Sequence, residues 1–579
     1  MEKRVLLAVV LSFIVLYGSQ ALFPPPKPQP KPAGAADSSR SGRDAAGAAV
    51  APAQAPPAEP AQPAKPADAP VVADNEERQI TFENASVAAT FSTRGGVLTS
   101  WRLKKYQDAS GQPLELVPPN MPPGTARPFA LAVEDPAVSA TLAKALFKPN
   151  TTDVRVGSAP ASLTFDYQDA SGLTARKEFL FSPDAPYVID FSATISRGDT
   201  SFVPTIEWGP ALGNGLAVES ATMYSPPAQP IFYRDGSVSR ISTGDVEANA
   251  RQDGVFGFAG VDDHYFLTAA LAPVQPLHLE YRRFSLPAGG TENKTANFIE
   301  WSARYQASPR NAKFFAGPKD FDVLAAVDRD LTRSIHFGMF AWLVVPLLRA
   351  LKWVNGFVGN YGWSIIVLTV LINLAMFPLR HKSVVSMRRM QELQPEVKAI
   401  QERYARLKVT DPARQKMNTE MMSLYRERGV NPASGCVPML LTLPVLFAFY
   451  SMLSVAIELR GAPFVGWIRD LSVHDPLFIT PVLMGLTQFV QTRMTPTTAD
   501  PMQQKMMMFM PLIFMTMLLW APSGLVLYWT TSNLWTIGQQ AVTNRLIGPS
   551  TPRAVRPPAE RRVKTVGGGK TDQAIKEQK

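Results

Sequence analysis

Residues Tyr361–Leu379 read YGWSIIVLTVLINLAMFPL, an apolar stretch without a charged side chain. Its length falls within the roughly 17–25 residues that a helix needs to cross the hydrocarbon core of a bilayer. We expect further spans at Cys436–Ile457, Pro476–Arg493, Met507–Ala521 and Gly524–Thr543. The segment 356–545 is therefore predicted to be an α-helical bundle that spans a membrane.

Another apolar run, Val5–Phe23, follows the basic pair Lys3 and Arg4. A cleaved signal peptide is the competing interpretation, but the run is long for one and has no clear small-residue cleavage site. We favour an uncleaved transmembrane anchor over residues 1–23, with its basic end in the cytoplasm. The Pro/Ala-rich segment 24–74 cannot bury enough apolar surface to fold, so it is predicted to be a semi-stiff linker.

Residues 75–320 show the alternation that is typical of β-strands. In Tyr187–Ile195 and Phe298–Tyr305 apolar and polar residues alternate, which places one face of each strand in a core and the other in water. Pairs such as Gly95-Gly96 and Ser182-Pro183 supply turns between strands. With hardly any helical periodicity, this exported segment is predicted to be an antiparallel, all-β sandwich.

The segment 321–355 contains the uncharged stretch Phe337–Leu348, which could be a further span. It is short and is followed by Arg349 and Lys352. If it crossed the membrane, the basic insert after Leu379 would lie outside the cell, against the positive-inside rule. We therefore predict a helix over Ser334–Val354 that lies in the outer interface. With the anchor this gives six transmembrane helices and places both chain ends in the cytoplasm.

The hydrophilic insert 380–430 is predicted to be a cytoplasmic helical hairpin, because apolar residues such as Val397, Ile400 and Tyr404 recur at helical spacing. Basic residues of the hairpin and of the tail 546–579 contribute to a formal net charge of +10. Such surfaces suit anionic lipids or the phosphates of an RNA-bearing partner such as the ribosome. The alternative is that they only fix topology. The candidate docking residues are Arg388, Arg389, Lys398, Arg403 and Arg406.

Motifs of enzymes and metal sites are missing from the sequence. The histidines are scattered without an H-E-x-x-H pattern, and Gly569-Lys570-Thr571 lacks the upstream glycine of a phosphate-binding loop. The single cysteine, Cys436, excludes an internal disulfide and a cysteine metal site. Apart from Arg493 at one end, the predicted C-terminal spans hold no charged residue, which argues against an ion-coupled transporter. We expect no catalytic residue and no metal.

Uncharged polar side chains are frequent within these spans. Thr369 and Asn373 lie four residues apart on one helix face, and Arg380 continues the stripe. A single Ser or Thr commonly bonds within or between helices, whereas an amide that faced lipid would leave several polar atoms unpaired. Together these residues predict a hydrated groove for substrate. Its candidate residues are Thr369, Asn373, Arg380, Thr442, Gln488, Thr516, Tyr528 and Ser532.

Several short motifs follow one another in a fixed order across residues 355–545. They are Trp363–Ile366, Met376–Leu379, Gln394-Pro395, Asn431-Pro432, Gly435–Pro438, Asp500–Lys505 and Pro522–Trp529. In these motifs the chain resembles the YidC-type membrane protein insertases, a family that includes the Oxa and Alb proteins of organelles. The anchor, the linker and the exported β domain resemble its Gram-negative branch.

This resemblance implies an inner-membrane insertase without cofactors, whose periplasmic domain has a galactose-mutarotase-like supersandwich fold. It implies nascent membrane proteins as substrates, membrane lipids as surroundings, the Sec translocon as a partner in some insertions, and no specific nucleic-acid target. In the family a groove open to cytoplasm and lipid receives the polar part of the substrate, whose apolar segment slides along the third and fifth spans.

The chain departs from the family at one groove position, because the motif alignment places Asn373 where the family usually has an arginine. One expectation is that Asn373 keeps the groove wet while Arg380 and His381 attract acidic substrate segments. The other is that hydration alone lowers the barrier and the charge is dispensable.

Two other functions stay open on the residues alone. A periplasmic sugar-binding or lipid-linked sugar-modifying protein would use the β domain, with His264 or His278 as candidates for a paired histidine and carboxylate. A transporter would need an intramembrane charge and an inverted repeat, and neither is evident. We expect an insertase rather than an enzyme, although fold by itself establishes no activity.

Overall fold

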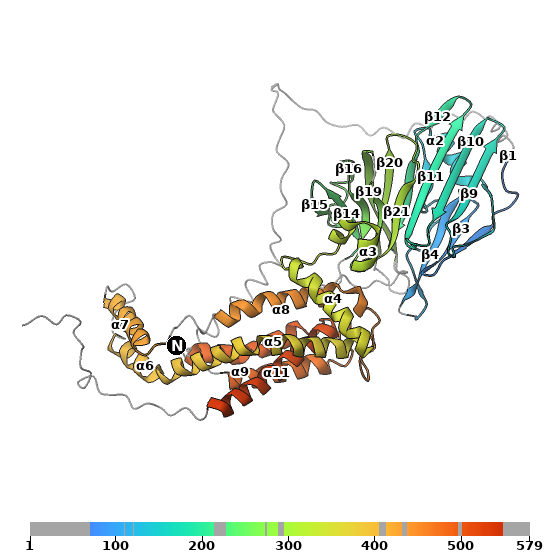
Figure 1. Cartoon of the computed structure of the whole chain (residues 1–579). Coiled ribbons are helices and arrows are strands. Elements are labelled where there is room, and N and C mark those ends of the chain that lie inside the picture. Colours follow the sequence, from blue (N-terminus) through green and yellow to red (C-terminus); the bar gives the residue numbers. More distant parts are fainter. Residues whose placement is uncertain are drawn as a thin grey trace, which may run out of the picture. The chain divides into compact units, whose positions relative to one another are not determined.

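The computed structural model describes residues 70–108, 110–119, 121–212, 227–272, 275–287, 295–404, 413–430, 437–495 and 501–547. The predicted anchor 1–23 and nearly all of the tail 546–579 lie outside these residues. Within them, strands occupy the first part of the chain and long helices the second (Figure 1). The linker 24–74 is described only from Pro70, and it ends earlier than predicted because Pro70–Val72 forms strand β1, which pairs with a neighbouring strand.

The largest sheet in the described part of the chain has 11 strands, in the order β1-β9-β10-β11-β21-β18-β17-β14-β15, with β7 beside β9 and β12 beside β11. Strand β10 buries every second residue, as the alternation of LTARKEFLF requires. The alternation predicted at Tyr187–Ile195 is confirmed in β11. The bounds are β7 Lys148–Pro149, β9 Ala161–Asp169, β10 Leu173–Phe181, β11 Val188–Arg197, β12 Thr200–Phe202, β14 Gln229–Arg234, β15 Ser237–Arg240, β17 Phe258–Asp262, β18 Phe266–Leu271 and β21 Ala312–Pro318.

Two five-stranded sheets complete the β region, in the orders β16-β19-β20-β13-β6 and β5-β4-β3-β2-β8. Their pairs are antiparallel except for β2 with β8, so the antiparallel prediction fails at that one edge. A long excursion separates these two strands in sequence, and parallel pairing needs such a crossover. The bounds are β2 Gln79–Glu83, β3 Val87–Ser92, β4 Val97–Gln107, β5 Pro113–Glu115, β6 Ala130–Ala132, β8 Asp153–Arg155, β13 Thr205–Ala211, β16 Arg251–Gly254, β19 Leu277–Pro287 and β20 Thr295–Tyr305.

An aromatic core joins the sheets. The ring of Phe129, next to β6, lies 4.9 Å from that of Phe191 on β11 and 5.3 Å from that of Trp208 on β13. Since these strands belong to different sheets, the sheets pack face to face on one core, as a sandwich requires. The sequence reading missed the helix α2 (Pro136–Lys144), although Asp135 before Pro136 is a typical N-terminal cap.

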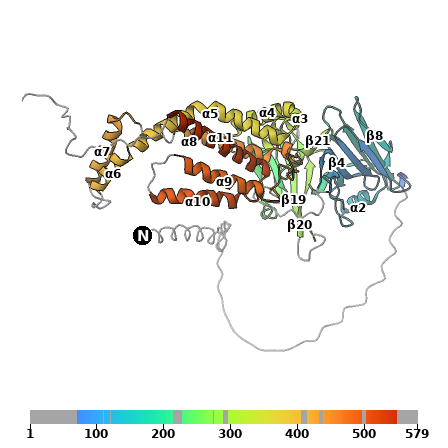
Figure 2. The ribbon, with the colours of Figure 1, turned by 90° about the horizontal axis from the view of Figure 1, so that it is seen from below.

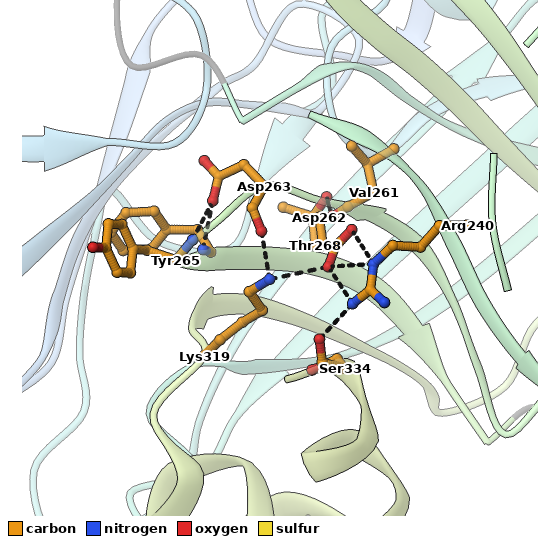
Figure 3. A network of polar contacts seen from close by, with 9 residues as sticks. Arg240, Val261, Asp262, Asp263, Tyr265, Thr268, Lys319 and Ser334 are labelled. Carbon is orange, nitrogen blue, oxygen red and sulfur yellow. Dashed lines mark hydrogen bonds and ion pairs between the residues drawn. The ribbon is translucent and has the colours of Figure 1, made fainter. Parts of the chain in front are cut away.

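Ionic contacts fix the end of the β region where the chain leaves it (Figure 3). The buried carboxylate of Asp262 on β17 accepts from Lys319 Nζ at 3.0 Å and from Arg240 Nη2 at 2.9 Å. Lys319 also donates to the backbone oxygen of Asp263, and Arg240 donates to that of Ser334. The network ties the segment after β21 to the sheet.

Three helical elements follow. They are α3 (Phe321–Val327), the 3₁₀ helix η1 (Arg329–Ser334) and α4 (Ala341–Val358). The helix predicted over Ser334–Val354 therefore begins later and ends later than expected. It starts after Gly338, whose φ of 69° is left-handed, and it stops at Gly359 with φ 70°.

The second part of the chain consists of helices α5 (Tyr361–Glu392), α8 (Val437–Val455), α9 (Ile479–Met494), α10 (Pro501–Met517) and α11 (Ser523–Ile547). Helix α11 packs against both α5 and α9 (Figure 2). Helix α5 does not end at Leu379 as predicted but continues to Glu392. The residues after Leu379 include good helix formers and no proline, and the break comes just before Pro395.

The hairpin that follows is formed by α6 (Gln394–Arg403) and α7 (Ala413–Glu427). Val397, Ile400 and Leu424 make a small buried cluster between them, with Tyr404 and Met421 packed against it, as the helical spacing predicts. The hairpin proper is therefore shorter than the predicted segment 380–430, because the residues before Leu393 belong to α5.

Length and hydropathy qualify two of the described helices, α4 and α5, as candidates for crossing a membrane. α5 carries the first predicted C-terminal span, whereas α4 is the helix that the charge distribution assigned to the interface. The six-helix count and the interfacial position of α4 therefore stay predictions. Trp342, Trp353 and Phe357 of α4 are exposed, which suits contact with lipid at either depth.

Candidate functional site

A cavity of about 470 Å³, lined by both polar and apolar side chains, lies between α5, α8, α9 and α11. Helices α5, α9 and α11 contribute polar side chains, and α8 contributes apolar ones. The lining residues are Thr369, Ile372, Asn373, Met376, Arg380, Ser383, Val384, Val445, Leu446, Phe449, Gln488, Gln491, Thr495, Tyr528, Trp529, Ser532, Asn533, Thr536, Gln539 and Gln540. A cavity of this size can hold several water molecules where polar partners are present.

The α5 wall is built from the stripe that the sequence indicated. The Thr369 hydroxyl donates to the Ile365 oxygen at 2.6 Å, one turn earlier on the helix. The Asn373 amide donates from Nδ2 to the Thr369 oxygen at 2.8 Å. Both side chains are buried, and these local bonds leave the Asn373 oxygen free to accept from another group.

That acceptor is used by Arg380. Its Nη1 donates to Asn373 Oδ1 at 2.7 Å and reaches Thr536 Oγ1 on α11 at 3.5 Å. The arginine side chain therefore runs back along α5 into the cavity. Among the lining residues Arg380 is the only one with a charged side chain.

The α11 wall is held to α9 by side-chain bonds. Trp529 Nε1 donates to Gln488 Oε1 at 3.1 Å. Asn533 donates to Thr487 Oγ1 at 3.3 Å and to the Met484 oxygen at 3.4 Å. In a membrane such interhelical bonds add only modest stability, but they fix which face of each helix lines the cavity.

Not all polar atoms of this wall are satisfied. Gln491 Oε1 and Gln539 Oε1 are buried without a hydrogen-bond partner among the described residues, and both residues line the cavity. A buried amide oxygen without a partner costs free energy unless water or a ligand supplies a donor. The wall of the cavity therefore contains two acceptors that the described residues leave unsatisfied.

Six of the predicted groove residues line this one cavity, namely Thr369, Asn373, Arg380, Gln488, Tyr528 and Ser532. Thr516 lies away from it, because α10 contributes no lining residue, and its exposed hydroxyl donates to the Ile513 oxygen of its own helix. Thr442 belongs to α8, but its side chain lies outside the described residues.

The polar lining residues that sequence reasoning missed include Asn533, Thr536 and Gln540 on α11. The signal available was their polarity within an apolar helix. The two residues predicted on α11, Tyr528 and Ser532, lie four apart on one helix face, whereas the cavity also takes residues from the adjacent face.

The hairpin residues proposed for docking differ in their surroundings. Arg389 and Lys398 are exposed, whereas Arg403 pairs with Glu420 at 3.1 Å and Arg388 donates to Asn544 at 2.7 Å. Arg406 lies outside the described residues. The exposed pair offers positive charge to a partner without breaking a contact within the chain.

The two candidate histidines of the β region do not share a cavity. His264 Nε2 contacts the Ser454 oxygen at 2.7 Å, and burial lowers the pKa of its imidazole to about 4. His278 Nδ1 pairs with Asp253 Oδ1 at 2.8 Å, but both side chains are more than half exposed. Within the described residues no group of three or more His, Cys, Asp or Glu side chains is placed to hold a metal ion.

Comparison with known proteins accounts for both parts of the chain. A family model described as 60Kd inner membrane protein matches residues 353–550, and one described as YidC periplasmic domain matches residues 79–350. The membrane protein insertase YidC of Geobacter metallireducens is 36% identical over 564 residues, which cover 94% of this chain and 99% of the relative. The chain belongs to the YidC family. The YidC of Geobacter sulfurreducens is 38% identical over 557 residues, with the same coverage.

Membership of the YidC family makes the chain a membrane protein insertase of the inner membrane, and not an enzyme. Its β region is the YidC periplasmic domain. Among solved structures, an active YidC insertase with the first transmembrane domain resolved is 18% identical and covers 82% of this chain and 95% of that chain, with a TM-score of 0.33. A galactose mutarotase-like protein from Lactobacillus casei is 11% identical and covers 42% of this chain and 100% of that chain, with a TM-score of 0.22.

Proposed function

We propose that the cavity between α5, α8, α9 and α11 receives the polar segment of a nascent membrane protein and shortens its path through the lipid. The observation that carries this proposal is the joint lining of the cavity by amides, hydroxyls and a single cation, Arg380. Two of its amide oxygens, those of Gln491 and Gln539, are buried without a hydrogen-bond partner among the described residues.

The physical reason is the cost of an unpaired backbone group in hydrocarbon. A polar segment that crosses a layer of about 30 Å leaves its peptide groups without hydrogen bonds, at several kcal/mol for each unsatisfied group. A hydrated cavity replaces part of that layer. Burial of the substrate's apolar segment then drives the net transfer, so the step needs no cofactor and no nucleotide.

Apolar helix surface supports a path for the rest of the substrate. In α10 the side chains of Phe509, Leu512 and Ile513 are exposed, as are several methionines. Flexible thioethers can adapt to varied apolar partners. The substrate's own span is proposed to slide along α8 and α10, the third and fifth spans of the family pattern, and to leave into lipid.

The topology proposed for the chain has six membrane crossings, with the N-terminal anchor as the first, α4 in the outer interface and both termini in the cytoplasm. The positive-inside rule supports it, because the hairpin and the tail then share the cytoplasmic side. From there the exposed Arg389 and Lys398 and the basic tail can meet the ribosome or anionic lipid. Cooperation with the Sec translocon is proposed on family grounds alone.

A galactose-mutarotase-like supersandwich remains the proposed fold of the β region, supported by its three stacked sheets. The exposed pair of His278 and Asp253 lies outside the cavity between the helices and gives no support to a role as a sugar enzyme.

Site-specific photo-crosslinking of a stalled nascent chain tests the cavity directly. A photoreactive residue at Ser532, which lines the cavity, is expected to crosslink to the substrate's polar segment. The matched position is Leu534 on the same helix, which is exposed and does not line the cavity. It is expected to crosslink to lipid or to the apolar segment. Equal crosslinking of the polar segment at both positions, or none at Ser532, would overturn the proposal.

A further inference from the structure

The position of the positive charge in the cavity depends on Asn373 as well as on Arg380. The Cα of Arg380 lies seven residues beyond that of Asn373 on α5, yet its guanidinium is bonded to the Asn373 oxygen. Two turns of helix rise by about 10 Å. The arginine therefore has to extend back along the helix for its charge to reach the buried middle of the stripe.

Asn373 is oriented for this contact. Its Nδ2 is committed to the Thr369 oxygen at 2.8 Å, which turns Oδ1 toward the cavity as an acceptor. Because Asn373 is buried, an acceptor left without a donor there would be costly, so the arginine bond relieves a penalty as well as fixing a position. The bond also spans Pro378, which has no N–H to complete the backbone ladder of α5.

The contact with Asn373 leaves the Nε–Nη2 edge of the guanidinium available for another acceptor. Both protein bonds of Arg380 use Nη1, and within the described residues Nε and Nη2 have no protein acceptor. The Nε–Nη2 edge is a geometry that binds a carboxylate through two parallel hydrogen bonds. Arg380 is thus anchored at one nitrogen and available at the other two.

We propose that Asn373 is a positioning residue: it holds the Arg380 guanidinium in the cavity, so that the Nε–Nη2 edge can meet the acidic substrate segments that the family resemblance leads us to expect. This inference rests on the proposed function of the cavity and names the substrate feature that it selects. Asn373 and Arg380 together then place a guanidinium in the part of the cavity that an arginine at position 373 would occupy.

The test uses the full-length chain in proteoliposomes of phosphatidylethanolamine and phosphatidylglycerol, with insertion measured by protease protection. Two single-span reporters differ only in their translocated segment, which carries either aspartates or asparagines. Arg380→Ala is expected to lower insertion of the aspartate reporter roughly tenfold, the usual scale for losing a charge-assisted bond, and to leave the asparagine reporter nearly unchanged. Lys382→Ala is the matched control, because Lys382 is exposed on the same helix and does not line the cavity.

Three variants then isolate Asn373. Asn373→Leu should impair the aspartate reporter about as much as Arg380→Ala, and should add nothing in the Arg380→Ala background, because it acts through the arginine. The exchange of Asn373→Arg with Arg380→Asn should restore insertion of the aspartate reporter. Arg380→Glu should reverse the preference toward a lysine-bearing segment.

The outcomes separate the two levels of the proposal. If Arg380→Ala treats both reporters alike, the charge has no part in the proposed function. If Arg380→Ala is selective but Asn373→Leu is not, or if their effects add, positioning by Asn373 is wrong while the cavity proposal stands. A general loss for both reporters, with the exchange failing to rescue, would also overturn positioning by indicating a purely structural role.

Discussion

The indole N–H of Trp529 on α11 lies 3.1 Å from Oε1 of Gln488 on α9 and donates a hydrogen bond to it across the helix interface. Both residues line the cavity. The bond therefore links the α9 and α11 sides of the cavity wall. If Trp529 were replaced, a water molecule in the cavity could donate to Gln488 instead. The free energy that this hydrogen bond contributes to stability therefore depends on whether the cavity contains water.

Trp529→Phe removes the donor together with part of the indole ring, and a control variant measures the packing lost with those atoms. In a hydrated cavity water replaces the indole on Gln488, so we expect a loss of stability below about 1 kcal/mol. In a dry cavity the unpaired oxygen would cost about 1–3 kcal/mol. The apparent thermal midpoint of the full-length chain in lipid nanodiscs, at one fixed scan rate, distinguishes the two. Trp535→Phe is the control, because it removes the same ring atoms while Trp535 Nε1 has no partner among the described residues, so the difference between the two variants isolates the lost hydrogen bond.

Solvent accessibility gives a second prediction. Cys436 is the only cysteine of the chain, so Cys436→Ser supplies a background without thiols. In that background a cysteine at Ser532 should react with a membrane-impermeant maleimide in inside-out vesicles. A cysteine at Leu534 should not, because the reactive thiolate forms in water and not in lipid. Equal labelling of both positions would contradict a hydrated cavity.

Lys177 of β10 predicts that the stability of the β region depends on pH. Its Nζ is fully buried and donates to the oxygens of Gly95, Gly96 and Phe129, at 2.7, 3.2 and 2.7 Å. The three carbonyls match the three donors of an ammonium group. Desolvation nevertheless lowers the pKa of Lys177 to about 7.

Because this pKa is lower in the folded than in the unfolded chain, the unfolded state binds more protons between pH 7 and the unperturbed value of about 10.4. The stability of the β region should therefore rise with pH through this window, by at most about 1.4 kcal/mol per unit. Lys177→Met should remove that contribution. The measurement is the difference in thermal midpoint between wild type and variant at pH 7, 8 and 9, followed by near-ultraviolet circular dichroism. A difference that stays constant with pH would show that Lys177 does not titrate there.

Lys352 on α4 supports a fourth prediction. Its ammonium group lies 2.6 Å from Glu458, 2.7 Å from Asp322 and 3.3 Å from Asp320, so it joins α4 to α3 and to the 3₁₀ helix η3 (Ile457–Leu459). Lys352→Met would leave Glu458 and Asp320, both largely buried, without their cation. We expect a loss of about 3–5 kcal/mol, as for other buried charges that lose a partner.

Limited proteolysis of the full-length chain measures this effect, since the segment around α3 should open and be cut faster in the Lys352→Met variant. Lys352→Arg keeps the charge and should retain most of the protection. Cleavage at the wild-type rate in Lys352→Met would mean that the cluster does not hold α4 in place.

Hydropathy located the helices of the bundle but not their ends. Helix α10 begins at Pro501 and includes Gln503, Gln504 and Lys505, and α5 runs past Arg380 to Glu392. Hydropathy reports where a chain meets lipid, whereas a helix continues until a cap or a proline stops it. The signals for these ends, Asp500-Pro501 and Gln394-Pro395, stood in the sequence as motifs and were not used as helix boundaries.

The cavity was predictable only as far as one helix face allows. Thr369 and Asn373 share a face by spacing alone, so their joint position follows from the sequence. The position of α10, which keeps Thr516 away from the cavity, depends on how the helices pack. No local sequence pattern encodes that packing. The backward course of Arg380 brings it to Asn373 on the same helix, but its additional contact with Thr536 depends on a distant helix.

The unbroken course of α5 from the cavity into the hairpin has a mechanical consequence. Helix α5 has 32 residues, carries Asn373 near its middle and leads into the hairpin of α6 and α7, here called the arm. A displacement of the arm is therefore transmitted along α5 to the wall of the cavity. Pro378, where the backbone ladder is incomplete, is the natural elbow of this helix. A change in the position of the arm would therefore alter the angle at Pro378 between the segment that carries Arg380 and the segment that carries Thr369.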